Sequence, residues 1–286
     1  MTNSIRQHAI LVCLIGFFLL ACGNEIQSVN SKTDNASYNP PSPSNVVSEG
    51  NEVKSDEAVR LNVGDREVQA LITKGKPSNL VYFNMHDDEK TAANVARAFV
   101  KIEGGTFVEL RHSGERLITF GLNGKSYKFD PNRIFTDAGI PKTLKLYGQT
   151  SPEAEKEVAR FAKELIERFL DKAGVIVAMH NNTDGGFSAA SYAKGGEYEK
   201  DTAEVFINPN NDLDDFFLVT ENDFFGAIKT KDFNVVLQNN ASVTDDGSLS
   251  VYCGRKGIKY VNVEAQHGHF DEQTRMLKEL LPIISK

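Results

Sequence analysis

A run of five apolar residues at positions 175–179 restricts the fold of this chain more than any other feature of its sequence. The run reads Val-Ile-Val-Ala-Met, and it follows Gly174, which ends a long amphipathic helical pattern. A strand that is apolar at every position is typical of a sheet with helices on both faces. The sequence therefore predicts an α/β domain in which this strand lies between helical layers.

Strand and helix patterns alternate along the rest of the chain. Strand patterns occupy residues 68–73, 79–85, 106–112, 116–122, 125–129, 204–207, 234–238 and 259–264. Helical patterns occupy residues 91–100, 151–172 and 271–284. The order of these elements predicts an α/β sandwich with a mixed sheet.

The N-terminal segment has the pattern of a targeting signal. Arg6 precedes an apolar run over residues 9–20, which is too short to span a bilayer but has the length of a signal-peptide core. The tetrapeptide Leu-Leu-Ala-Cys that ends at Cys22 resembles the lipobox of bacterial lipoproteins. This resemblance implies cleavage before Cys22 and a lipid anchor on its thiol. The alternative is an ordinary secretory peptide that is cut near Ala21.

The segment after Cys22 is rich in Asn, Ser, Pro and Gly, which is typical of a flexible tether. We therefore predict a signal peptide over residues 1–21, a lipidated tether over residues 22–57 and one catalytic domain over residues 58–286. The expected location is the bacterial envelope, as a periplasmic or outer-membrane lipoprotein that contacts the membrane through its lipid. Cys253 would be the one remaining thiol of the mature chain, so no intramolecular disulfide can form.

Composition narrows the classes of function. The 286 residues carry 32 basic and 39 acidic side chains, for a net charge of −7, and there is no basic block. A protein that must neutralise many phosphates needs the opposite balance, so a nucleic-acid partner is not expected. No Gly-x-Ser-x-Gly elbow occurs, which argues against a serine hydrolase of the α/β-hydrolase type.

Two of the predicted apolar strands end in histidine. The first runs into His86-x-x-Glu89, and the second runs into His180. An imidazole and a carboxylate at this spacing can meet one Zn²⁺ ion, and side chains at the carboxyl ends of strands face the crevice where open α/β sheets bind substrates. The alternative for the first motif is a strand-end histidine followed by a first-turn carboxylate that the helix dipole favours.

The ordered set of His86-x-x-Glu89, Asn132-Arg133, His180 and Glu264 resembles the signature of the zinc carboxypeptidase superfamily, which includes the succinylglutamate desuccinylase and aspartoacylase branch. The resemblance implies a three-layer α/β/α sandwich with a mixed, mostly parallel sheet. It implies one Zn²⁺ per chain, bound by His86, Glu89 and His180. It also implies that Glu264, at the end of an apolar strand, is the general base.

Asn132 and Arg133 are the expected binding site for a substrate carboxylate. Arginine offers a planar fork that matches a carboxylate, and asparagine adds a neutral donor. The resemblance also gives Arg133 a catalytic role in stabilising the oxyanion, and it makes Tyr252 a candidate for the tyrosine that covers the substrate. The alternative is that the Asn132-Arg133 pair forms a turn after a hairpin, with Arg133 solvated.

Other polar residues near these motifs have less defined roles. His267 and His269 are rival metal ligands, although two histidines on alternate residues also suit a solvated surface. Asp87 and Asp88 stand between His86 and Glu89, where they can cap a helix or orient an imidazole. Cys253 is expected to be buried or incidental.

The function expected from these motifs is that of an envelope-anchored zinc hydrolase that cleaves an amide bond beside a carboxylate. A carboxypeptidase that acts on short or peptidoglycan-derived peptides is favoured. The alternatives are an N-acyl amino acid deacylase and a non-catalytic lipoprotein that binds peptides or cell-wall fragments. The retained set of three ligands and a general base argues against the last of these.

Overall fold

The computed structural model describes residues 56–286. The predicted signal peptide, Cys22 and the tether up to residue 55 therefore lie outside the described residues. The first strand begins at Glu57, one residue before the predicted start of the catalytic domain. Within residues 56–286, no helix has the length and apolar character needed to cross a membrane.

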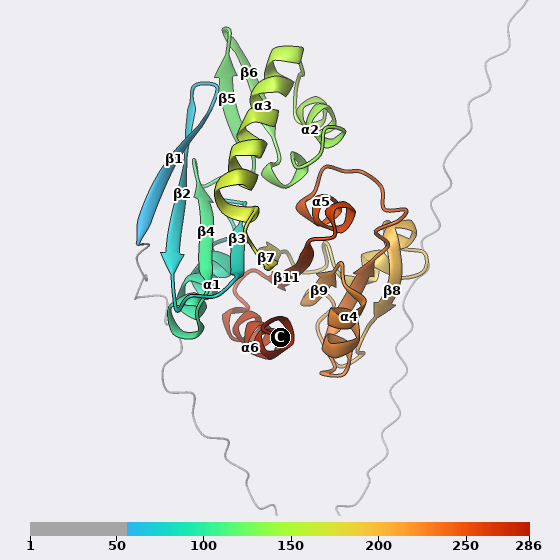
Figure 1. The fold of residues 1–286 in the computed structure, drawn as a ribbon. Coiled ribbons are helices and arrows are strands. Elements are labelled where there is room, and N and C mark those ends of the chain that lie inside the picture. Colours follow the sequence, from blue (N-terminus) through green and yellow to red (C-terminus); the bar gives the residue numbers. More distant parts are fainter. Residues whose placement is uncertain (1–55) are drawn as a thin grey trace, which may run out of the picture. The chain divides into compact units, whose positions relative to one another are not determined.

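A nine-stranded mixed sheet forms the middle layer, in the order β1-β2-β4-β3-β7-β11-β9-β10-β8 (Figure 1). Its strands are β1 (Glu57–Val63), β2 (Arg66–Lys74), β3 (Leu80–Asn84), β4 (Thr106–Arg111), β7 (Val175–Asn182), β8 (Thr202–Phe206), β9 (Phe216–Val219), β10 (Asn234–Gln238) and β11 (Lys259–Gln266). The four central strands β4, β3, β7 and β11 are parallel. Strands β9 and β10 are also parallel, and the remaining neighbours are antiparallel.

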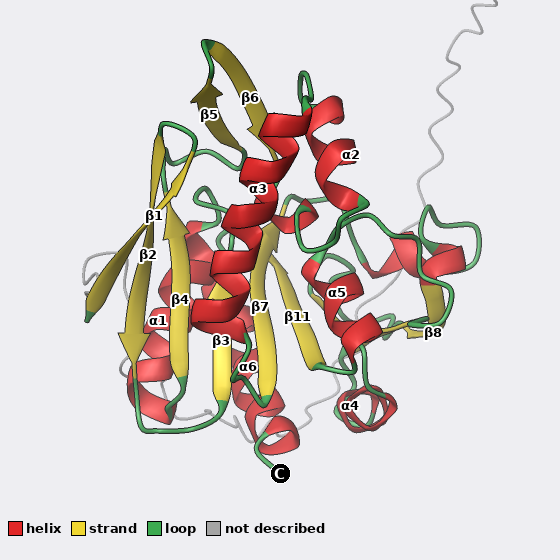
Figure 2. Cartoon of the chain, turned by 45° about the horizontal axis from the view of Figure 1, so that its top comes forward, coloured by secondary structure: helices red, strands yellow, loops and turns green. Residues whose placement is uncertain are grey.

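Helices cover both faces of this sheet, so the predicted three-layer α/β/α sandwich is confirmed. They are α1 (Lys90–Glu103), α2 (Gly139–Leu146), α3 (Pro152–Leu165), α4 (Asn222–Lys229), α5 (Leu249–Lys256) and α6 (Phe270–Ile284). Helices α1, α4 and α6 lie on one face of the sheet, and α2, α3 and α5 lie on the other (Figure 2). The buried side chains of each group join a separate hydrophobic core. A small second sheet of β5 (Ile118–Leu122) and β6 (Lys125–Phe129) joins the α2 and α3 side.

Strand β7 is buried along its whole length, as its apolar run predicted. Its side chains alternate between the two cores: Val175 and Val177 face α1, α4 and α6, while Ile176 and Ala178 face α2, α3 and α5. Because alternate residues of a strand share a face, His180 lies on the same side as Ile176 and Ala178. The sheet therefore directs His180 toward the α2, α3 and α5 layer.

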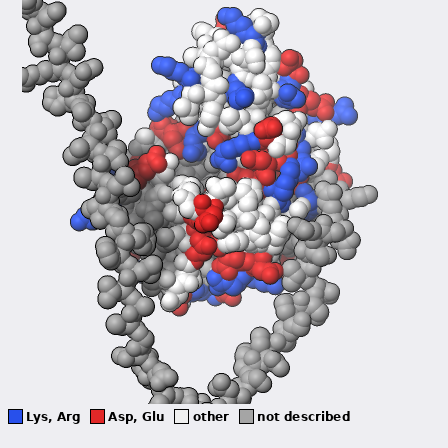
Figure 3. All heavy atoms as spheres, turned by 180° about the vertical axis from the view of Figure 1, so that it is seen from behind, with Lys and Arg blue, Asp and Glu red and all other residues white. Residues whose placement is uncertain are grey.

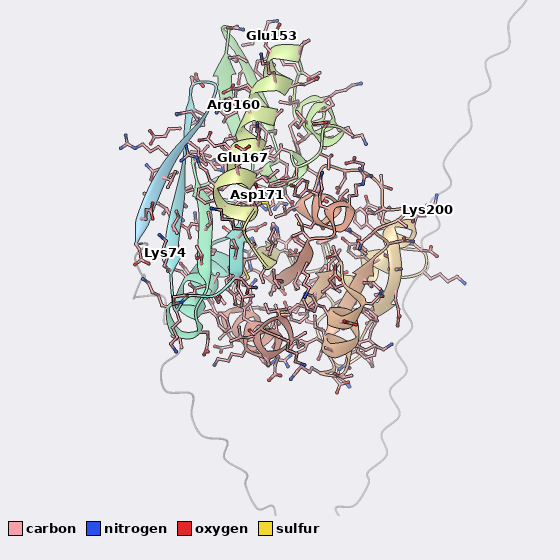
Figure 4. All side chains as sticks on the ribbon, viewed as in Figure 1. Lys74, Glu153, Arg160, Glu167, Asp171 and Lys200 are labelled. Carbon is pink, nitrogen blue, oxygen red and sulfur yellow. The ribbon has the colours of Figure 1, made fainter. Side chains whose placement is uncertain are left out.

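Charged side chains cover the outer surfaces of the domain. Acidic and basic residues are mixed along α3 and the π-helical turn that extends it, Ile166–Leu170, and Figure 4 labels Glu153, Arg160 and Glu167 among them. Arg160 forms ion pairs there with Glu157 at 2.8 Å and Glu164 at 3.1 Å. On the opposite side of the molecule, acidic and basic side chains are also interspersed, and neither sign covers the visible face (Figure 3).

Candidate active site

The carboxyl ends of β3, β7 and β11 bring the candidate site together. These strands are neighbours and parallel, so their carboxyl ends meet at one edge of the sheet. Glu264 on β11 lies directly opposite His180 on β7 in the strand register. His86 follows the end of β3 by two residues, and Glu89 is the residue that precedes α1.

His86, Glu89 and His180 form a compact buried cluster. The two carboxylate oxygens of Glu89 lie 2.8 Å from His86 Nδ1 and 2.9 Å from His180 Nδ1. The two Nδ1 atoms are only 3.2 Å apart. The exposed fractions of the three residues are 0%, 1% and 4%. The three predicted ligands therefore converge on one point, where their ligand atoms lie within 4.8 Å of one another.

The residues of this cluster fit a zinc ion. Two imidazole nitrogens that face each other at 3.2 Å both carry lone pairs unless one of them is protonated, so the arrangement favours a cation between them. Tetrahedral ligands at zinc bond lengths of about 2.0–2.2 Å are separated by about 3.3 Å, close to the spacings found here. Two histidines and one glutamate also form a donor set of catalytic zinc sites, which keep one position for water or substrate.

The charges around His86 support the same conclusion. Burial disfavours a positive charge on this imidazole, but the carboxylates of Glu89 and Asp130 outweigh burial and raise the pKa of His86 to about 9. Burial likewise opposes a charge on Glu89, yet His86 and His180 hold the pKa of that carboxyl well below its usual range. The pocket is thus built to hold a positive charge, carried by a proton or by a metal ion.

Asp130 orients His86 through Nε2, the ring nitrogen that does not face the cluster. Its Oδ1 lies 2.8 Å from His86 Nε2, and the same carboxylate caps the short helix Pro131–Arg133 by accepting a hydrogen bond from the Asn132 backbone. Because a carboxylate can only accept, Nε2 of His86 carries a proton, and Nδ1, which faces Glu89 and His180, would be the atom that binds a metal. Such carboxylate–histidine pairs commonly support zinc ligands. Sequence analysis did not assign Asp130 to the site.

Arg116 is a second site residue that the sequence did not indicate. Its Nη1 donates a hydrogen bond to Glu89 Oε1 at 2.8 Å, and its Nε lies 3.7 Å from Asp130 Oδ2. Arg116 comes from the loop between β4 and β5, which has no motif of its own. Only the folded structure places this guanidinium beside the cluster.

Glu264 is buried, with an exposed fraction of 5%, and lines the same pocket as Glu89 and His180. Asn262 Nδ2 donates a hydrogen bond to Glu264 Oε2 at 3.0 Å. Burial is the main cause that raises the pKa of Glu264 to about 7, and the charge of Glu89 adds to it. A carboxyl group with this pKa can both accept and release a proton near neutral pH.

The active-site pocket has a volume of about 480 Å³. His180, Glu89 and Glu264 line it, whereas His86 is buried behind its wall. Other residues that line the pocket include Arg116, Asn132, Arg133, Tyr192, Asp201, Leu218, Gln238, Asp246, Ser250, Val251, Tyr260 and Asn262. Its size is within the range of small-molecule sites in proteins.

Asn132 and Arg133 reach this pocket from the short helix after β6. Asn132 Oδ1 accepts a hydrogen bond from the Leu249 backbone at 3.0 Å, so its Nδ2 donor is left for the pocket. Arg133 donates to the Asn132 carbonyl at 2.9 Å, and its Nε lies 3.6 Å from Asp246 Oδ2. The pair is therefore placed where a substrate carboxylate can reach it, and its binding role stays a prediction.

The structure corrects the placement of Tyr252. This residue lies outside the active-site pocket and lines a second cavity of about 300 Å³, together with Phe135, Glu167 and Asp171. Its ring packs against Phe135 at 6.5 Å between centroids. Successive helical residues point about 100° apart, so Val251 of α5 faces the active-site pocket and Tyr252 faces α2 and α3.

His267 and His269 do not share a metal site. His267 lines the active-site pocket, whereas His269 Nδ1 contacts Asp215 Oδ2 at 2.9 Å. Asp212, Asp215 and His269 form the second group of potential metal ligands among residues 56–286. The Asp215 carboxylate already accepts a hydrogen bond from the Gln266 backbone and contacts His269, so hydrogen bonds within the protein account for this group without a metal ion.

Asp87 has a structural role that the sequence did not resolve. Its Oδ2 accepts three backbone hydrogen bonds, from His112 at 2.6 Å, Ser113 at 2.9 Å and Gly114 at 2.7 Å. It therefore holds the loop that leads to Arg116 and does not orient an imidazole. Asp88 lines the pocket.

Some solved structures are similar to this chain. No family model matches the sequence, and no curated protein matches it. Similar solved structures include an aspartoacylase family protein from Mesorhizobium loti, with 12% identity, a TM-score of 0.43, and coverage of 82% of this chain and 68% of the other. A succinylglutamatedesuccinylase/aspartoacylase from Rhodobacter sphaeroides has 13% identity and a TM-score of 0.38, with 76% of this chain and 59% of that one covered.

Thrombin activatable fibrinolysis inhibitor has 12% identity and a TM-score of 0.46, with 80% of this chain and 69% of that one covered. This chain thus spans less than two thirds of the Rhodobacter protein and slightly more than two thirds of the other two. The first two structures carry the name of the branch that the sequence motifs resemble.

Proposed function

We propose that this protein is a zinc-dependent hydrolase that cleaves an amide bond beside a carboxylate. The observation that carries the proposal is one pocket in which His180 and Glu89 converge with His86, while Glu264 faces them from the neighbouring strand. A module that only binds peptides does not require a buried carboxyl group with a pKa of about 7 beside three potential zinc ligands.

Different residues of the pocket carry out different parts of the reaction. Zinc held by His86, Glu89 and His180 would supply a Lewis acid that polarises the scissile carbonyl and acidifies water. Glu264 removes a proton from the attacking water, whose oxygen bonds to the carbonyl carbon. Glu264 then passes this proton to the leaving nitrogen as the carbon–nitrogen bond breaks.

Two arginines serve different ends of the substrate in this proposal. Arg116 lies beside Glu89, so its guanidinium is placed to stabilise negative charge on the carbonyl oxygen. Arg133 and Asn132 bind the substrate carboxylate. The sequence-based assignment of both tasks to Arg133 is thus divided between two residues.

The substrate class that we favour is a short peptide with a free C-terminus, including peptides derived from peptidoglycan. A lipid anchor at Cys22 would place the enzyme in the envelope, where such peptides are abundant amides. Deacylation of an N-acyl amino acid uses the same chemistry with a smaller substrate and is the alternative activity. Loss of membrane partitioning in a Cys22→Ala variant would test the anchor.

The test of the proposed function is hydrolysis of three compounds by the zinc-loaded protein: a muropeptide, a matched peptide amidated at its C-terminus, and an N-acyl amino acid. We expect cleavage of the free-acid peptide and a loss of rate on amidation. In Glu264→Gln, which is nearly isosteric, zinc should remain while the rate falls by roughly 10²- to 10⁴-fold. Near wild-type turnover in this variant would rule out Glu264 as the base.

A further inference from the structure

Two amide side chains in the active-site pocket use their nitrogens in hydrogen bonds to residues 56–286, while their oxygens accept none from these residues. They are Asn262 of β11 and Gln238 of β10. Leu218 of β9 lies between them, since Asn262 is its neighbour in the β11–β9 register and β10 borders β9 on the other side. All three side chains line the same pocket, and Asn262 contacts Glu264 within it.

The orientation of the Asn262 amide is fixed by its partner. Its nitrogen donates to Glu264 Oε2 at 3.0 Å, which is the arrangement required when Glu264 is ionised and acts as a base, so the other amide atom is the oxygen. Among residues 56–286 this buried Oδ1 has no hydrogen-bond partner. The exposed fraction of Asn262 is 8%. A buried acceptor that lacks a donor is destabilising, and a ligand that supplies the donor recovers this cost.

The Gln238 amide is oriented in the same way. Its nitrogen donates to Asn240 Oδ1 at 2.9 Å and to the Ser250 carbonyl at 3.1 Å. Asn240 is itself fixed, because its own nitrogen donates to the Thr220 carbonyl at 2.9 Å. Gln238 Oε1 accepts no hydrogen bond from residues 56–286, so this second amide also turns its oxygen away from a partner.

The surrounding charges favour the same kind of ligand group. Asp201 and Asp246 line this pocket, and no lysine of the described residues does. Arg133 lies 3.6 Å from Asp246, so part of its charge is already offset. Leu218 and Val251 supply apolar surface for the stem of a side chain. This part of the pocket therefore suits a short aliphatic stem that ends in a hydrogen-bond donor.

We propose that the substrate residue beside the scissile bond carries a side chain that ends in an N–H donor group, which is a primary amide or an ammonium. Asn262 recognises this donor through Oδ1, and Gln238 is a second acceptor in the same pocket. The inference rests on the proposed function and narrows its substrate class. Asn262 then has two tasks, because its nitrogen holds Glu264 and its oxygen selects the substrate.

A measurement of ligand binding tests substrate recognition by Asn262 separately from its contact with Glu264, because it does not depend on turnover. Isothermal titration calorimetry on the zinc-loaded full chain would compare two matched pairs, lysine with norleucine and glutamine with glutamate, each as both enantiomers. Lysine and glutamine should bind at least about tenfold more tightly than their partners that lack the donor. Tighter binding of lysine than of glutamine would identify the ammonium as the group, and the reverse order would identify the amide.

Two nearly isosteric variants isolate the acceptor. Asn262→Leu removes both the donor to Glu264 and the acceptor, whereas Asn262→Asp keeps an acceptor oxygen. We expect the preference to fall to within about twofold in Asn262→Leu and to persist in Asn262→Asp. Thermal unfolding of both variants checks that they fold, and Gln238→Met, with Gln149→Met on the surface as its control, tests the second acceptor.

Several outcomes would overturn the inference: equal binding within both pairs, no binding of any of the four amino acids, or an unchanged preference in Asn262→Leu. Hydrolysis measured on the same preparations keeps the two proposals distinct. Zinc-dependent hydrolysis without a side-chain preference would overturn this inference alone. A clear preference in binding without any hydrolysis would overturn the proposed function alone.

Discussion

At the scale of single residues, burial of ionisable groups determines how the pocket responds to pH. The pKa of Glu264 is about 7 in the fold, above its ordinary value of 4.5. The folded state therefore binds more protons than the unfolded state between these two values. Stability falls as pH rises through this window, and the full cost is present above pH 7.

Glu264→Gln should therefore stabilise the metal-free protein at alkaline pH. At pH 8 we expect a gain of about 2–3 kcal/mol in the free energy of unfolding, and near pH 4 we expect almost no change. Urea unfolding with a chelator present, at both pH values, measures the difference. A gain of equal size at both pH values would show that packing, and not the buried charge, causes it.

Asp130 should control zinc affinity without binding zinc itself. In Asp130→Asn the partner of His86 Nε2 no longer accepts as an anion, so the Nδ1 lone pair is less strongly fixed toward the metal. We expect zinc affinity to fall by roughly 10- to 100-fold while the fold is kept. Competition with a chromophoric chelator measures the affinity, and unchanged affinity would mean that Asp130 only caps the following helix.

At the scale of elements, long periodic patterns predicted the structure well. Strands β2, β3, β4, β6, β7, β10 and β11 and helices α1, α3 and α6 lie where their patterns place them. The missed elements are short or weakly patterned: β9 has four residues, while α2, α4 and α5 have eight each. Such lengths give no more than about two helical turns in which a period can be recognised. Strand β1 buries only Leu61 and Val63, so its apolar signal is small.

The site was predicted in part for a related reason. His180 and Glu264 lie near the carboxyl ends of their strands, His86 and Glu89 follow the end of β3, and the ends of neighbouring parallel strands meet in any fold of this class. Arg116 comes from a loop, and the direction of Tyr252 depends on how a short helix is rotated about its axis. Neither property is encoded in a local pattern of residues.

The packing of α2 against the loop before α5 is a test at this scale. A Cβ at Gly139 would lie 2.2 Å from the Gly247 Cα and 2.7 Å from the Arg133 carbonyl oxygen. Gly139→Ala should therefore destabilise the fold by roughly 1–3 kcal/mol and displace Arg133, which raises KM. These changes are measured by chemical unfolding and by steady-state kinetics.

Gly226 of α4 supplies the matched control, because a Cβ there meets no atom within 4 Å. Gly226→Ala should stabilise the protein by about 0.5–1 kcal/mol, since alanine favours the helix. Equal effects of the two substitutions would contradict the close contact at Gly139.

At the scale of the whole molecule, the sheet lies between two hydrophobic cores, and the site lies at the carboxyl ends of its central strands. Each core packs helices on one face of the sheet, which leaves the polar carboxyl ends of β3, β7 and β11 to form the pocket. The buried carboxylates of Glu89 and Asp130 favour a positive charge at the cluster, which a zinc ion would supply. The central claim of this account is therefore that the fold binds zinc at this point.

Metal analysis by native mass spectrometry tests that claim most directly, on the wild type, His180→Ala and His269→Ala. We predict one zinc per chain in the wild type and in His269→Ala, which alters the second group of potential ligands, and none in His180→Ala. Retention of stoichiometric zinc in His180→Ala together with its loss in His269→Ala would contradict the account, because it would place the metal at Asp212, Asp215 and His269.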